Sequence, residues 1–187
     1  ADGPLSGNPL AVVHGAAALT DDVMLAFARW TNLSETAFLL PPASERADYR
    51  VRIFTPGGEL PFAGHPTLGV CHAWLEAGGR PRIRGEVVQE CGIGLVSIRR
   101  TDDDVAFAAP PLRMEAVDDA LLDAVLRALG LPREAVREAI WLDNGPRWLA
   151  LLLDGTERVL SIEPDHAALK SLAKVGVAAS YPAGSAA

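Results

Sequence analysis

Cysteine is scarce in this sequence, with Cys71 and Cys91 the only two among 187 residues. Two cysteines are too few for the disulfide framework of a small secreted domain. They also lack the paired spacing of a zinc site. We therefore expect reduced thiols in a reducing compartment, with Cys71 packed in a helix core and Cys91 half-buried at a bend.

Long apolar runs and an excess of basic residues are also missing. No stretch of about 18 apolar residues is present, and no basic segment is followed by an apolar one, so we expect neither a membrane span nor a signal peptide. The 17 Lys and Arg against 24 Asp and Glu give a net charge of −7, which disfavours nucleic-acid binding. The default expectation is a soluble cytoplasmic protein.

The first half of the chain alternates strand and helix patterns. A helix predicted to follow His65-Pro66 ends at Gly78, so Gly64 and His65 should lie at its N-terminus. We predict strands over residues 9–14, 36–40 and 49–54 and a hairpin over 85–100. We also predict a helix over 67–77 and a helix over 21–30 with Met24, Leu25 and Phe27 facing inward.

Two consecutive prolines, Pro110 and Pro111, mark the best domain boundary, because they disfavour a continuous helix or sheet. We therefore predict a first domain over residues 1–109 and a second over 110–187. The second should contain helices over 118–129 and 164–172, and strands over 139–142 and 148–153.

Several motifs follow one another in a specific order along the chain. They are Gly7-Asn8-Pro9, Ser34-Glu35-Thr36-Ala37-Phe38, Pro61-Phe62-Ala63-Gly64-His65-Pro66, Asn144-Gly145-Pro146-Arg147 and Pro164-Asp165-His166. This set resembles the PhzF family of cofactor-independent isomerases. The resemblance implies an α+β fold of two lobes, similar to diaminopimelate epimerase, in which each lobe is a bent mixed sheet wrapped around a central helix.

The resemblance gives Glu35 the central catalytic role. In the family, the Glu of the Ser-Glu-Thr motif takes a proton from one carbon of the substrate and returns it to another. Partial burial beside Leu33 and Phe38 would suit such a carboxylate. From the local pattern alone, an exposed residue at a strand entry or a capping residue is the more common interpretation of Glu35. The resemblance reverses that preference.

His65 is the second catalytic candidate. It lies at a helix start, where unpaired N–H groups and the helix dipole favour negative charge. Without the resemblance, a histidine that merely caps the helix is an equally good interpretation. The resemblance implies that His65 assists the rearrangement and that the backbone of Gly64 contacts the substrate. Ser34, Asn144 and Gly145 are further substrate-binding candidates, although Asn144-Gly145 also fits an ordinary hairpin turn.

The resemblance implies that no cofactor is required and that the substrate is a small cyclic amino- or hydroxy-carboxylic acid. The most specific candidate is trans-2,3-dihydro-3-hydroxyanthranilate, in secondary metabolism of the phenazine type. No metal is expected, because the separations of His14, His72 and His166 give no ligand pair on one helix face. A two-thiol racemase is disfavoured, since Ala63 occupies the position where that branch has its first thiol.

The chain departs from the family in its second lobe. The family's acidic segment ending in Thr-Gly-Ser-Ala is not present in full, and only Gly184-Ser185-Ala186-Ala187 resembles its end. We therefore expect an incomplete second lobe with exposed apolar surface, and a homodimer or larger assembly that buries it. The alternative function is a catalytically silent binding or oligomerisation module derived from the enzyme.

Overall fold

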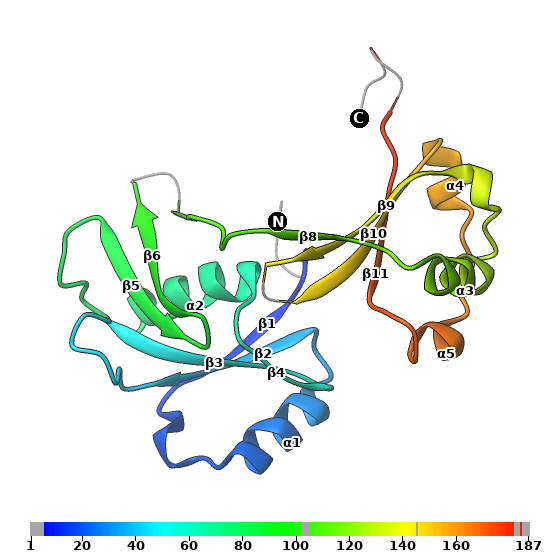
Figure 1. Ribbon diagram of the computed structural model, residues 1–187. Helices are drawn as coiled ribbons and strands as arrows, with labels where there is room; N and C mark the ends of the chain where they lie inside the picture. The colour runs from blue at the N-terminus through cyan, green and yellow to red at the C-terminus, as the bar shows by residue number, and fades with distance from the viewer. Residues whose placement is uncertain (1–5, 102–104, 145, 182–183, 185–187) are drawn as a thin grey trace. The chain divides into compact units, whose positions relative to one another are not determined.

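The computed structural model describes residues 6–101, 105–144, 146–181 and 184. The chain divides into two compact units, Ala1–Pro110 and Pro111–Ala187 (Figure 1). Each unit contains one mixed sheet with its own helices and its own hydrophobic core. The predicted α+β fold is confirmed. Within the described ranges, no helix is long and apolar enough to cross a membrane.

The first unit is built on a seven-stranded sheet that curls around one helix, α2 (Gly64–Glu76) (Figure 1). The strands lie in the order β1-β2-β3-β5-β6-β7, and β4 pairs with β3. The β1–β2 and β3–β5 pairs are parallel, whereas the other pairs are antiparallel. The strands are β1 (Leu10–Val13), β2 (Glu35–Leu40), β3 (Tyr49–Thr55), β4 (Gly58–Leu60), β5 (Glu86–Cys91), β6 (Gly94–Arg100) and β7 (Val105–Phe107).

The two faces of β2 and β3 enter different cores, because successive side chains of a strand point to opposite faces. Ala37 and Leu39 pack inward with Val70 and Cys71 of α2, whereas Phe38 packs outward. The outer core is covered by α1 (Asp21–Thr31) and a short 3-10 helix, η1 (Ala16–Ala18). The strand β2 is therefore buried on both sides.

Helix α1 begins as the sequence predicts but turns a different face to the core. The Thr20 side chain accepts a hydrogen bond from the Val23 N–H and so caps the helix. Met24 is fully buried, as expected. Phe27 was expected to face inward but is 36% exposed, and Ala28 takes the buried position instead. A small residue fits there because the helix lies close to Phe38 and Phe54.

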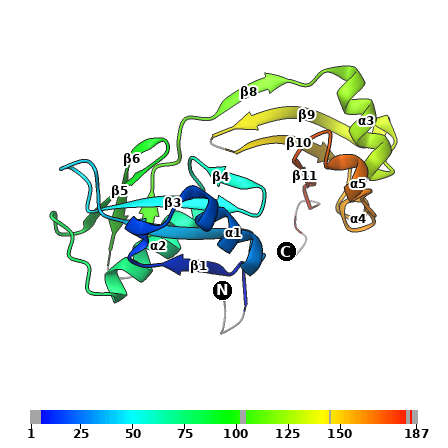
Figure 2. The same ribbon diagram turned by 90° about the horizontal axis from the view of Figure 1, so that it is seen from below.

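The second unit is a four-stranded sheet of order β11-β10-β9-β8, in which only the β10–β11 pair is parallel. Figure 2 shows β9 and β10 side by side at its centre. Its elements are β8 (Arg113–Ala116), α3 (Asp119–Leu129), η2 (Arg133–Ala135), β9 (Val136–Asp143), β10 (Arg147–Leu153), α4 (Thr156–Leu160), α5 (His166–Leu169) and β11 (Val175–Ala178).

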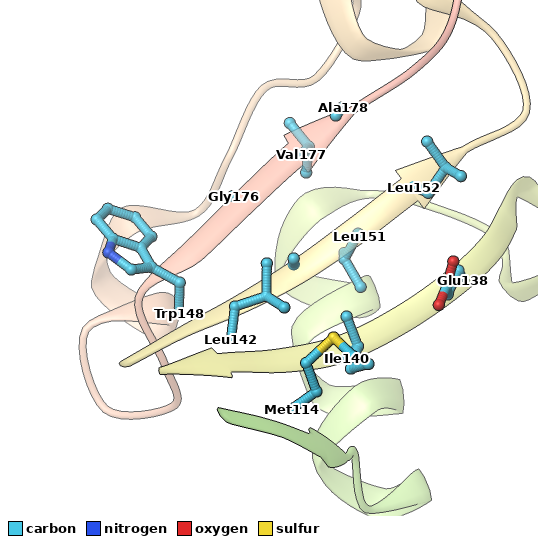
Figure 3. Close-up of a pocket in the computed structure, with 11 residues that line it drawn as sticks. Met114, Glu138, Ile140, Leu142, Trp148, Leu151, Leu152, Gly176, Val177 and Ala178 are labelled. Carbon is cyan, nitrogen blue, oxygen red and sulfur yellow. The ribbon is translucent and has the colours of Figure 1, made fainter. Parts of the chain in front are cut away.

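The two faces of this second sheet differ sharply. One face packs Leu149, Leu151 and Leu153 against the apolar stripe of α3, which is capped by Asp118 and ends at Gly130. The other face is an open apolar groove of about 400 Å³ (Figure 3). Its lining includes Met114, Ile140, Leu142, Trp148, Ala150 and Leu152, with one charged residue, Glu138. Met114 is 64% and Trp148 43% exposed.

Candidate active site

The site forms where the parallel strands β1 and β2 begin. Because the strands are parallel, their first residues meet at one edge of the sheet, and Leu10 pairs with Glu35 in the register. Just before the strands, the Ser34 hydroxyl donates a hydrogen bond to Asn8 Oδ1 at 2.7 Å. This bond ties together the two segments that enter the sheet and so fixes the backbone beside Glu35.

The end of α1 sets the direction in which the chain enters β2. Asn32 adopts the left-handed conformation, with φ 53°, and its N–H donates to the Ala28 carbonyl. An asparagine tolerates this conformation better than most residues. The Thr31 and Thr36 hydroxyls are 3.0 Å apart across the turn. Glu35 therefore begins its strand from a short, tightly held turn.

His65 reaches the same place from α2, which packs against β1 and β2. The helix approaches β1 closely at Gly69, where an added Cβ would lie 2.7 Å from the Leu10 side chain. The absence of a side chain at Gly69 thus lets α2 lie against the strand that pairs with Glu35. The helix begins at Gly64, three residues before the predicted start, so His65 belongs to its first turn.

The two predicted catalytic side chains face each other. His65 Nδ1 lies 3.6 Å from Glu35 Oε2, close enough for electrostatic interaction but longer than a good hydrogen bond. The Glu35 side chain is 17% exposed and that of His65 is 38% exposed. Among the described residues, the buried atoms Glu35 Oε2 and His65 Nε2 have no hydrogen-bond partner. Buried polar atoms are usually paired, so these two are available to a bound molecule.

An aromatic ring borders the site at Gly64. A Cβ added to Gly64 would lie 3.4 Å from Cζ of Phe107, which itself packs edge-on against Phe62 with ring centroids 5.5 Å apart. Gly64 is half-buried, and its neighbour Ala63 is buried. The start of α2 therefore combines backbone N–H groups with an apolar wall.

The structure brings together four of the six predicted site residues. Glu35, His65, Ser34 and Gly64 gather at one edge of the first unit. Asn144 is exposed and follows β9 in the second unit, and Gly145 lies outside the described residues. Their contact with substrate stays a prediction.

Sequence reasoning assigned no role to two residues at this edge, Asn8 and Phe107. The Gly7-Asn8-Pro9 motif was a signal for Asn8, because it precedes a strand in the same way that Ser34 does. No local signal marked Phe107, which arrives from β7, far along the chain.

Both cysteines of the chain are free thiols. Cys71, a residue of α2, is fully buried in the hydrophobic core, and Cys91 is half-buried. Burial raises the pKa of both thiols. Ala63 stands before Gly64, where a racemase would place a thiol. No cluster of three or more His, Cys, Asp or Glu suited to a metal ion occurs among the described residues.

Comparison with known proteins places the chain in a family. Residues 1–187 match the PhzC-PhzF family, described as phenazine biosynthesis-like protein. The chain belongs to this family. A solved structure of a predicted epimerase from Pseudomonas aeruginosa, 28% identical, matches with a TM-score of 0.74 over 96% of this chain and 66% of its own.

Two curated relatives of this PhzC-PhzF chain have different names. The antisense-enhancing sequence 1 protein of Schizosaccharomyces pombe is 38% identical over 90% of this chain and 60% of its own length. The trans-2,3-dihydro-3-hydroxyanthranilate isomerase of Pseudomonas aeruginosa is 35% identical over 89% of this chain and 59% of its own. The chain thus spans about 60% of the length of these relatives.

Proposed function

We propose that this protein is a cofactor-independent isomerase that moves a proton by general acid/base catalysis on a small cyclic carboxylic acid. The observation that carries the proposal is the Glu35–His65 pair, 3.6 Å apart, in which Glu35 Oε2 and His65 Nε2 are buried without a partner among the described residues. A mostly buried carboxylate is shielded from bulk water, as a group that must hold a proton between two steps requires.

The chemistry is a proton transfer out and back. The Glu35 carboxylate takes a proton from one carbon of the substrate, so that a C–H bond breaks, an O–H bond forms and the electron pair passes into the conjugated system of the substrate. The same carboxyl group then returns the proton to another carbon. His65 forms hydrogen bonds to the substrate, and negative charge that develops near Gly64 is stabilised by the N-terminus of α2.

The proposed substrate class is supported by the name of a relative. The relative from Pseudomonas aeruginosa is named for trans-2,3-dihydro-3-hydroxyanthranilate, and we propose this compound as the most specific candidate, in phenazine-type antibiotic biosynthesis. Ser34 and the Gly64 backbone would contact the substrate in the first unit. Contact of Asn144 and Gly145 with the substrate remains a prediction of the family resemblance.

Incubation of the purified protein with trans-2,3-dihydro-3-hydroxyanthranilate in deuterated water tests the proposal. Proton NMR should show conversion to the isomer, with deuterium entering at the carbon that receives the proton only to the extent that the Glu35 carboxyl proton exchanges with solvent before it is returned. Binding without any conversion would contradict the enzyme proposal and would identify the chain as a silent binding module.

We also propose that two copies of the chain associate through the open face of the second sheet. Support comes from the exposed Met114 and Trp148 along a groove with one charged side chain, Glu138. An apolar face of this kind is costly to leave in water.

The reduced thiols of Cys71 and Cys91 fit action in the reducing cytoplasm.

A further inference from the structure

Three buried polar side chains connect the strands of the first unit to the start of α2. The Tyr49 hydroxyl donates to Gln89 Oε1 at 3.1 Å, and Gln89 Nε2 donates to Thr67 Oγ1 at 3.1 Å. The Thr67 hydroxyl then donates to the Ala63 carbonyl oxygen at 2.9 Å. Tyr49 is 2% exposed, and Gln89 and Thr67 are 0% exposed. The chain of bonds therefore lies entirely inside the protein.

All three bonds run in one direction, toward Ala63. The amide oxygen of Gln89 can only accept and its nitrogen can only donate, so the hydroxyl of Tyr49 must be the donor. Burial raises the pKa of that phenol, which keeps its proton in place. Hydrogen bonds arranged head to tail polarise one another, and the effect is stronger in a low-dielectric interior.

The end of the chain is the peptide group that joins Ala63 to Gly64. Its carbonyl accepts both the Thr67 hydroxyl and the Thr67 N–H, at 2.9 and 3.2 Å. The N–H of the same planar peptide belongs to Gly64 and points away from the carbonyl. As one of the first N–H groups of α2, it has no acceptor within the helix. Two bonds to the carbonyl fix this plane and draw electron density from the nitrogen.

The way in which α2 is capped supports a role beyond helix stability. An ordinary N-cap side chain would accept a hydrogen bond from an N–H of the first turn, but the cap residue here is Ala63, and no side-chain cap bond is formed. The buried polar groups bind the carbonyl side instead. The N–H groups beside His65 are thus left for a ligand.

We propose that Thr67, Gln89 and Tyr49 are positioning residues that hold and polarise the Ala63–Gly64 peptide, so that the Gly64 N–H stabilises negative charge developing on the substrate. This inference rests on the proposed function of the Glu35–His65 site. The three neutral side chains would thus affect the turnover rate without touching the substrate, through the Gly64 N–H alone.

Thr67 offers a matched pair of substitutions. Thr67→Val keeps the shape and removes the hydroxyl, whereas Thr67→Ser keeps the hydroxyl. Val70→Ala, at a buried position of the same helix, controls for general loss of stability. Loss of one hydrogen-bond donor to an oxyanion lowers kcat by about a hundredfold to a thousandfold, and weakening a donor should lower kcat less. We therefore expect kcat to fall roughly tenfold in Thr67→Val, with KM little changed. In Thr67→Ser, kcat should recover.

A second readout does not depend on turnover. In the ligand-free protein, the Gly64 amide proton resonance should move to lower frequency in Thr67→Val, as its N–H becomes less polarised, and should stay in place in Thr67→Ser and Val70→Ala. An unmoved Gly64 resonance in Thr67→Val, or full activity of that variant, would overturn the inference. An inactive wild type would refute the proposed function alone, and the amide resonance would then decide the positioning role.

Discussion

Two atoms of the site, Glu35 Oε2 and His65 Nε2, are buried without a hydrogen-bond partner among the described residues. An unpaired buried polar atom costs about 1–3 kcal/mol, so a protein selected for stability alone would pair or remove it. The Ser34–Asn8 bond and the left-handed Asn32 hold the backbone around Glu35 in place. Hydrogen bonds thus hold the backbone of the site, while these two atoms can still bind a ligand.

The two thiols give a prediction about pH. Because burial raises the pKa of Cys71 and Cys91, the reactive thiolate is scarcer at neutral pH than in a free cysteine. Alkylation by iodoacetamide, followed by intact-protein mass spectrometry, should be slow at pH 7 and should accelerate only above the usual range of a thiol. Cys91, the less buried, should react first. Rapid labelling of Cys71 at pH 7 would contradict this account of the core.

Elements with a strong local pattern could be predicted from the sequence, and several short ones could not. Helix α3 has a strong apolar stripe, an Asp118 cap and a Gly130 stop, so its pattern alone determines its bounds. By contrast, β4, β11 and α4 are short and were missed. The strand β11 (Val175–Ala178) exists because β10 pairs with it in parallel, and such long-range pairing leaves no trace in local periodicity.

The site shows the same division. The motifs indicated Ser34, Glu35, Gly64 and His65, because each motif is contiguous in the sequence. The Gln89–Thr67 and Tyr49–Gln89 bonds join residues 22 and 40 positions apart. A buried glutamine in a strand gives no local signal of the helix it will touch, so this network could be recognised only in the folded chain.

A glycine in the β5–β6 hairpin gives a prediction at the scale of elements. A Cβ added to Gly92 would lie 2.6 Å from Cα and 2.9 Å from the carbonyl oxygen of Pro61. These are backbone atoms of the segment leading into α2, and they cannot move without shifting it. Gly92→Ala should therefore reduce the free energy of unfolding by about 1–3 kcal/mol in urea denaturation.

The matched control for that substitution is Gly57→Ala. An added Cβ there would meet only Thr55 Oγ1, at an ordinary contact distance of 3.5 Å. Its unfolding midpoint should stay close to that of the wild type. Equal stability of the Gly57 and Gly92 variants would show that the close contact between the hairpin and Pro61 does not exist in solution.

At the scale of the whole molecule, we expect the exposed apolar face of the second sheet to be buried against a second copy of the chain. A charge on this face should prevent burial against a second copy. We expect sedimentation velocity at micromolar concentration to give a dimer for the wild type and a monomer for Leu152→Asp. Arg127→Glu, which alters charge on exposed α3 surface, should remain dimeric. A wild type that is monomeric throughout this range would contradict the association.

The central claim is that Glu35 carries the proton. Glu35→Gln keeps the shape of the side chain but removes its basic oxygen. With trans-2,3-dihydro-3-hydroxyanthranilate as substrate, the single most direct measurement is the turnover rate of this variant beside its affinity for the substrate by calorimetry. For His65→Ala we expect turnover to fall by about a hundredfold to ten-thousandfold, as is typical when acid/base assistance is lost. For Glu35→Gln the account predicts a larger fall in turnover, with substrate binding retained. Turnover of Glu35→Gln at the wild-type rate would contradict it.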